Sequence, residues 1–170
     1  IIRIYYFPYQ IPVTLDALEY LIYAIVTSKT GYFPQDWAMP TNGWPSFLSV
    51  FFALFNPDSF FDYIYIQRSL TIAISILTII PMYLLGRRFF ERPYAMLCTL
   101  LFTLEPRLII NSLSGIAEPL FILLGTTTLF FFLSNNSKSI YVSFTIAACF
   151  SIIRYEGLLI FLPLSIIFFL

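Results

Sequence analysis

The sequence predicts an all-α fold, a polytopic bundle of transmembrane helices. Hydrophobic residues make up 59% of the chain and charged residues only 11%, and the mean hydropathy is +0.86. A soluble domain is about 45–50% apolar and about 25% charged, so both values depart towards a membrane protein. Apolar runs separated by short polar breaks predict about five spans, at residues 69–85, 94–113 (interrupted at 105–107), 116–133, 140–153 and 157–170.

The chain divides into two predicted regions at residues 67 and 68. Region 1–67 is rich in proline and contains no apolar run of the ~20 residues that a span needs, so we expect a long first extracytoplasmic loop carrying short amphipathic helices. Region 68–170 is the predicted transmembrane bundle, whose short runs favour tilted or packed helices. Because the chain starts at Ile1 and its last apolar run reaches Leu170, we expect an N-terminal fragment, truncated at the C-terminus.

Basic residues set the predicted orientation. Segment 86–93 contains three arginines and one glutamate, so the positive-inside rule places it in the cytoplasm. Counting spans then places 134–139 inside and places 1–67, 105–115 and 154–156 outside. The protein is therefore predicted to be a multi-pass cell-membrane protein with an extracytoplasmic polar site. The charged residues expected at the outer face are Asp16, Glu19, Glu105, Arg107, Glu118, Arg154 and Glu156.

The composition also excludes several classes of function. The chain has no histidine, which removes His-based acid–base catalysis, His metal ligands and Ser-His triads. Its net charge is zero, so nucleic acid is not an expected partner. The expected surroundings are a lipid bilayer.

Residues 12–25 predict a helix that begins with two acids. Thr14 fits the N-cap position, and Asp16 then lies in the first turn, where the helix dipole favours an anion. Helical spacing predicts a polar face of Asp16, Glu19, Tyr20 and Tyr23, and an apolar face of Leu15, Leu18, Ile22 and Ile25. This helix is either a site of chemistry or an interfacial helix whose acids are simply solvated.

Two later residues, Trp44 and Glu118, are candidates for binding. Trp44, in Asn42-Gly43-Trp44-Pro45, either anchors at the membrane interface or stacks on a sugar or acceptor. Glu118 stands where a span begins, followed by Pro119, and an unpaired anion there is costly, so we expect a cation or ligand nearby.

Two arginines are candidate partners for that anion. Arg154 and Arg107 both lie at predicted outer span ends, and an arginine fork can bond two phosphate oxygens at once. The alternative for Arg154 is a structural Arg–Glu pair.

Taken together, these motifs resemble the membrane glycosyltransferases of the GT-C type. The resemblance is greatest to the branch of the protein O-mannosyltransferases, the lipid A aminoarabinose transferase and their archaeal relatives. It covers nearly the whole chain and depends on the order of motifs that are each weak alone. They are Thr14-Leu15-Asp16-Ala17-Leu18-Glu19-Tyr20, Asn42-Gly43-Trp44-Pro45, Gly86-Arg87-Arg88-Phe89-Phe90, Asn111-Ser112-Leu113-Ser114-Gly115-Ile116-Ala117-Glu118-Pro119-Leu120 and Arg154-Tyr155-Glu156-Gly157.

The resemblance implies an inverting transferase that moves a sugar from a polyprenyl-phosphate donor to a protein, lipid or glycan acceptor. Asp16 matches the family's catalytic carboxylate, Glu118 an acidic position near the site, and Arg154, less closely, a basic one. The family acid is often followed at once by a second acid, whereas here Ala17 follows Asp16 and Glu19 comes later. No cofactor or metal ligand is predicted, and the use of a divalent cation stays open.

The predicted roles are specific enough to test. Asp16 takes the proton of the acceptor hydroxyl, and Arg154 or Arg107 stabilises the departing lipid phosphate. Glu19, Glu118 and Trp44 bind sugar or acceptor. We therefore expect Asp16, Glu118 and Arg154 to converge on one outer cavity.

Two alternatives remain. A lipid-linked-sugar transporter or flippase expects charges in mid-span or on both sides of the membrane. A non-catalytic membrane scaffold expects Asp16, Glu118 and Arg154 to point to separate places.

Overall fold

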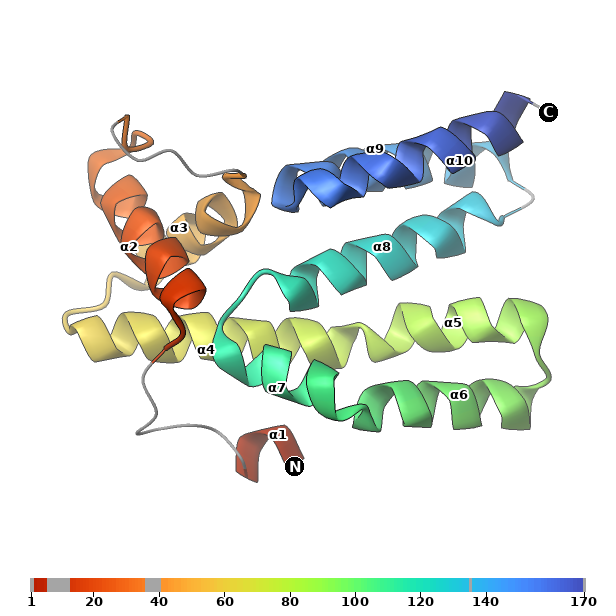
Figure 1. Ribbon diagram of the computed structural model, residues 1–170, viewed down its shortest axis with the longest axis horizontal. Helices are drawn as coiled ribbons and strands as arrows, with labels where there is room; N and C mark the ends of the chain where they lie inside the picture. The colour runs from red at the N-terminus through yellow and green to blue at the C-terminus, as the bar shows by residue number, and fades with distance from the viewer. Residues whose placement is uncertain (1, 6–12, 36–40, 135, 170) are drawn as a thin grey trace.

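The computed structural model describes residues 2–5, 13–35, 41–134 and 136–169, and within these ranges the protein is entirely helical (Figure 1). The predicted all-α class is confirmed. In chain order the elements are α1 (Ile2–Tyr5), α2 (Leu15–Thr30), α3 (Gly43–Phe55), α4 (Phe60–Leu77), α5 (Ile79–Phe89), α6 (Arg92–Leu104), α7 (Pro106–Ser114), α8 (Glu118–Phe132), α9 (Ser137–Ile153), the 3₁₀ turn η1 (Tyr155–Gly157) and α10 (Leu158–Phe169).

Local sequence signals explain where several helices begin. The hydroxyl of Thr14 accepts a hydrogen bond from the N–H of Ala17, so Thr14 is the N-cap of α2, as expected. A capping box of Ser59 and Asp62 opens α4. Pro119 occupies the first turn of α8, where the missing N–H costs nothing.

The first predicted span is longer than the sequence indicated. Helices α4 and α5 form a nearly continuous helix of 30 residues, Phe60–Phe89, which runs unbroken through the predicted regional boundary at 67 and 68. Only 22% of its most apolar window is buried. A core helix of a soluble protein is mostly buried, so the exposure of this helix is unusual for that class.

Helices α6 and α7 form a bent pair. Their axes differ by 51° across the break at Glu105. Pro106 has no N–H and restricts the residue before it to extended backbone, and Glu105 accordingly adopts φ −60° and ψ 121°. The carboxylate of Glu105 then accepts from the N–H of Leu108 at 2.7 Å, which caps α7.

The α5–α6 turn lies at the same end of the molecule as the end of α8 and the start of α9, whereas the start of α8 and the end of α9 lie nearer α2 and α3 (Figure 1). At one end, which we call the basic end, Arg88 in the last turn of α5 donates to the carbonyl of Leu133 at the end of α8. At the other, the acidic end, α2 and α3 meet the start of α8 and the end of α9. Among the described residues only Phe60–Phe89 is long and apolar enough to cross a membrane, or two such segments if the bent pair α6–α7 counts as one.

The packing forms one large core and one small one. The large core lies at the acidic end, where α2, α3, α4 and α8 meet around Trp44, Leu48 and Phe52. The small core joins α8, α9 and α10 through Phe132, Ala147 and Leu164. Many large apolar side chains stay on the outside, among them Leu100, Leu159 and Phe169.

Candidate functional site

Arg154 joins Glu118 and Glu156 in an ion-pair cluster at the acidic end. Nη1 of Arg154 lies 2.6 Å from Oε1 of Glu118, and Nη2 lies 2.9 Å from Oε1 of Glu156. Nε of Arg154 also donates to Oε2 of Glu156 at 3.3 Å, which completes a two-pronged contact. The three side chains are 30–35% exposed, so the cluster lies at the edge of the fold.

Backbone geometry after α9 creates this contact. Arg154 is extended, with φ −148° and ψ 136°, and η1 then turns the chain so that Glu156 faces back towards it. Gly157 permits the turn because a Cβ there would lie 2.8 Å from the carbonyl oxygen of Phe150. The hydrogen bond to Glu156 is the largest cause that raises the pKa of Arg154, and the charge of Glu118 adds to it.

Glu118 is positioned by the turn that precedes α8. Gly115 has a left-handed φ of +79°, which favours glycine, and its carbonyl accepts two side-chain hydrogen bonds. Nε2 of Gln67 donates to it at 2.7 Å, and Nε1 of Trp44 donates at 3.3 Å. Helices α3 and α4 thus fix the turn from which Glu118 projects. The cation partner that was expected for Glu118 is Arg154.

Tyr20 connects this cluster electrostatically to α2. Burial raises the pKa of the Tyr20 phenol, and the charge of Glu118 raises it further, while Arg154 lowers it. Asp16 and Glu19, on the same helix as Tyr20, also raise that pKa. All four charges thus act on one phenol, and α2 brings its two acids to the same end of the molecule as the Arg154 cluster.

Gln67 also fixes the first turn of α2. It is fully buried, and its Nε2 donates to the carbonyl of Ala17 at 3.0 Å as well as to Gly115. One amide group therefore ties the helix that carries Asp16 to the turn that precedes Glu118. This role was not predicted from the sequence, although a glutamine within a largely apolar helix was a visible signal.

The predicted faces of α2 need a correction. Leu15, assigned to the apolar face, is 80% exposed, and Tyr23, assigned to the polar face, is only 1% exposed. The buried stripe is instead Ala17, Leu21 and Ala24. Small alanines allow α3 and α4 to approach closely there, a preference that residue hydrophobicity alone does not reveal. Asp16 and Glu19 are exposed, as a polar face requires.

Trp44 also differs from the expectation. Both predicted roles, an interfacial anchor and a platform for a sugar, require an exposed ring, but Trp44 is fully buried. Its indole is stacked on Phe47 and bonded to Gly115. The sequence placed it by analogy with membrane-interface tryptophans, whereas the packing of α3 against α2 and α8 turns it inward.

The remaining outer charges have separate positions. Arg107 is exposed in the first turn of α7, and Glu105 caps the same helix, whereas the ion pairs of Arg154 are with Glu118 and Glu156. Arg68, by contrast, is 2% exposed within α4. The sequence analysis treated it only as the boundary of the first span.

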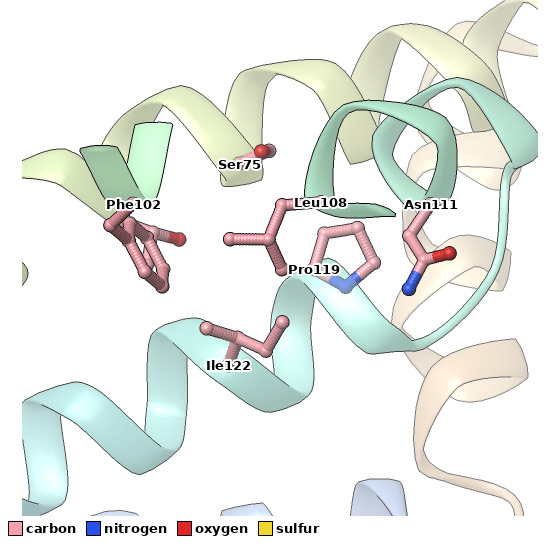
Figure 2. Close-up of a pocket in the computed structure, with 7 residues that line it drawn as sticks. Ser75, Phe102, Leu108, Asn111, Pro119 and Ile122 are labelled. Atoms are coloured by element: carbon pink, nitrogen blue, oxygen red, sulfur yellow. The ribbon is translucent and has the colours of Figure 1, made fainter. Parts of the chain in front are cut away.

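A small cavity lies between α4, α7 and α8, next to Pro119 (Figure 2). Asn111 and Leu108 approach it from α7, and Ile122 from α8. Its volume is about 10 Å³, which is enough for about one water and too small for a sugar or a phosphate. Asp16, Glu118 and Arg154 do not line this cavity, so it is not the shared outer cavity that the sequence predicted.

The charge balance limits what the acidic end can bind. Arg154 binds two carboxylates, those of Glu118 and Glu156, and α2 adds the carboxylates of Asp16 and Glu19. Negative charge is therefore in excess. A phosphate would need further positive charge, from Arg107 or a divalent cation. Among the described residues, no group of three or more cysteines or acids is arranged to hold a metal ion.

No known family model matches the chain, and neither the curated proteins nor the solved structures contain a significant match.

Proposed function

We propose that the protein is an inverting membrane glycosyltransferase that moves a sugar from a polyprenyl phosphate to an acceptor hydroxyl at the outer membrane face. The observation that carries the proposal is that Arg154 binds the acid at the start of α8, while the acid-bearing first turn of α2 is tied to the turn just before that acid. Gln67 ties the first turn of α2 to the turn before α8, and Arg154 binds Glu118 at 2.6 Å. A scaffold has no need to gather these groups at one end.

A bilayer setting is consistent with the distribution of apolar surface. Phe60–Phe89 is long enough to cross the roughly 30 Å hydrocarbon core, and little of it is buried. We propose that the bent pair α6–α7 and the shorter helices α8, α9 and α10 also cross, as tilted or packed helices. A lipid-linked donor then reaches the acidic end from within the membrane.

Asp16 is the proposed general base. Its carboxylate is exposed in the first turn of α2, where an acceptor hydroxyl can approach. As the sugar C1–phosphate oxygen bond breaks, the acceptor oxygen bonds to C1, its proton passes to Asp16, and the lipid phosphate departs with the bonding electrons. A positioned base typically contributes about 10²–10⁴-fold to the rate.

Arg154 is the proposed partner of the lipid phosphate. Its bonds to the two glutamates use three of the roughly five guanidinium N–H groups, so about two remain for phosphate oxygens. Glu118 and Glu156 thus orient the guanidinium rather than occupy it fully.

The test measures release of lipid phosphate from a radiolabelled polyprenyl-phosphate sugar by the purified full-length protein. We expect Asp16→Asn to lower the single-turnover rate by about 10²–10⁴-fold while donor binding and the thermal midpoint persist. Asp58→Asn is the matched control, because Asp58 is an equally exposed acid before α4. Near-normal turnover by Asp16→Asn would refute the assignment of the base. Transport of the intact donor across vesicles, without cleavage, would favour the flippase alternative.

A further inference from the structure

A long groove runs between α5 and α6, away from the site proposed above. Its volume is about 740 Å³, within the roughly 300–1,000 Å³ typical of ligand sites. Tyr83 borders it from α5, and Met96, Leu97 and Leu100 border it from α6. These three apolar side chains are more than half exposed, so the groove opens to the outside of the helix layer.

Arg92 stands at one end of the groove and Thr103 at the other. Arg92, in the first turn of α6, is the one charged residue among those that line it. At the far end Thr103 donates its hydroxyl to the carbonyl of Thr99, so it presents no free donor to the groove. The carbonyl of Thr103 accepts from Nη2 of Arg3 at 3.3 Å, but Arg3 is not among the residues that line the groove.

The length of the groove matches half a bilayer. Arg92 and Thr103 are eleven residues apart on one helix, which at a rise of about 1.5 Å per residue is about 16 Å. One leaflet contributes about half of the roughly 30 Å hydrocarbon core. An acyl chain lying in the groove would extend from the headgroup level at Arg92 to about the membrane midplane.

Charge complementarity selects the lipid. Turn 86–93 carries Arg87, Arg88 and Arg92 against Glu91. Arg87 donates within its own turn and Arg88 donates to Leu133, whereas the Arg92 side chain lines the groove. We propose that this groove binds one acyl chain of an anionic phospholipid, with the lipid phosphate paired to Arg92. The inference requires the bilayer setting of the proposed function but none of its chemistry.

The test places a reporter in the groove of the full-length protein. Met96→Trp is reconstituted in vesicles with equal amounts of phosphatidylglycerol and phosphatidylcholine, and bromine is placed on the chains of only one of the two lipids. Bromine quenches tryptophan on contact, and the signal of Trp37 and Trp44 is subtracted with the parent chain. We expect the site to prefer phosphatidylglycerol by about fivefold, the effect of one basic residue near an anionic surface.

Charge variants then identify the source of the preference. Arg92→Gln should make the two lipids quench equally, and Arg92→Lys should retain the preference, which also excludes a folding defect. Lys138→Gln, which removes one charge from the other turn at the basic end, should change nothing. Equal quenching with Arg92 intact would overturn the selectivity, and no quenching by either lipid would show that another protein segment covers the groove. No sugar donor is used, so this failure is distinguishable from failure of the proposed reaction.

Discussion

The acidic and basic ends of the helix layer use their polar residues in different ways. At the acidic end, polar side chains join elements far apart in sequence, as Arg154 does with Glu118 and Gln67 does with Gly115. At the basic end, Arg88 joins the two turns, but Arg87 bonds within its own turn and Arg92 lines the outer groove. The acidic end therefore holds its charged side chains in fixed positions, whereas the basic end leaves Arg92 exposed at the surface.

Two glycines should give the largest difference between the ends. A Cβ on Gly43 would lie 2.5 Å from the carbonyl oxygen of Ile152, so Gly43→Ala must separate α3 from α9. We expect Gly43→Ala to lower the free energy of unfolding by about 1–3 kcal/mol. A Cβ on Gly86 would lie 3.5 Å from Cβ of Ala95, an ordinary contact, and Ala is the better helix former, so Gly86→Ala should gain up to about 1 kcal/mol.

Thermal unfolding of the detergent-solubilised protein measures both substitutions. For a chain of this size, 1 kcal/mol corresponds to about 2–4 °C in the midpoint. Equal midpoints for Gly43→Ala and Gly86→Ala would mean that the tight contact between α3 and α9 does not exist in solution.

Arginine substitutions should give the next largest effect. Arg154→Gln leaves Glu118 and Glu156 unpaired at a partly buried edge. We expect the free energy of unfolding to fall by about 1–2 kcal/mol, a value between those typical of surface and of buried ion pairs. Arg88→Gln removes a bond to Leu133 and a contact with the Phe130 ring, on an exposed side chain. Arg88→Gln should therefore lower the free energy of unfolding by less than about 1 kcal/mol.

A double substitution separates charge repulsion from lost packing. If unpaired carboxylates cause the loss in Arg154→Gln, adding Glu118→Gln should recover part of the thermal midpoint. An additive result, with both losses summed, would argue against direct coupling of the two side chains.

The smallest predicted effect concerns Tyr20. Because burial and nearby acids raise its pKa in the folded state, the folded protein holds the phenol proton more tightly than the unfolded chain does. The resulting stability is present below the unfolded pKa of about 10 and is lost as the pH rises through the folded value. The stability of the parent should therefore fall more steeply than that of Tyr20→Phe in the alkaline range.

Difference absorbance of tyrosinate gives the same comparison spectroscopically. Glu118→Gln should lower the pKa of Tyr20 towards its ordinary value, and Arg154→Gln should raise it. Identical titrations of Tyr20 in the parent and in Glu118→Gln would remove the electrostatic link between α2 and the Arg154 cluster.

Local signals in the sequence were enough to predict several helix starts and the grouping of connections. Thr14 and Pro119 act through their own turns, so their positions could be predicted without knowledge of packing. The positive-inside rule depends only on the number of basic residues. It placed segments 86–93 and 134–139 on the same side, and the structure has both at one end. Whether these ends face opposite sides of a membrane stays a prediction.

Contacts between distant helices could not be predicted in this way. Trp44 and Leu15 were misplaced because hydrophobicity does not show which face of a helix its neighbours cover. Gln67 was overlooked because its importance depends on Ala17 and Gly115, which are distant in the chain. The proposed catalytic role of Asp16 depends on a substrate position that neither periodicity nor packing determines.

Both the proposed reaction site and the proposed lipid groove require the two ends to lie on opposite sides of a membrane. Impermeant thiol labelling in intact cells tests this claim directly, after Cys98 and Cys149 are replaced by serine. A cysteine at Asp58, an exposed position beside the acidic end, should react from outside. A cysteine at Ser137, exposed at the basic end, should react only after permeabilisation. Labelling in the reverse order, or at both positions in intact cells, would contradict the account.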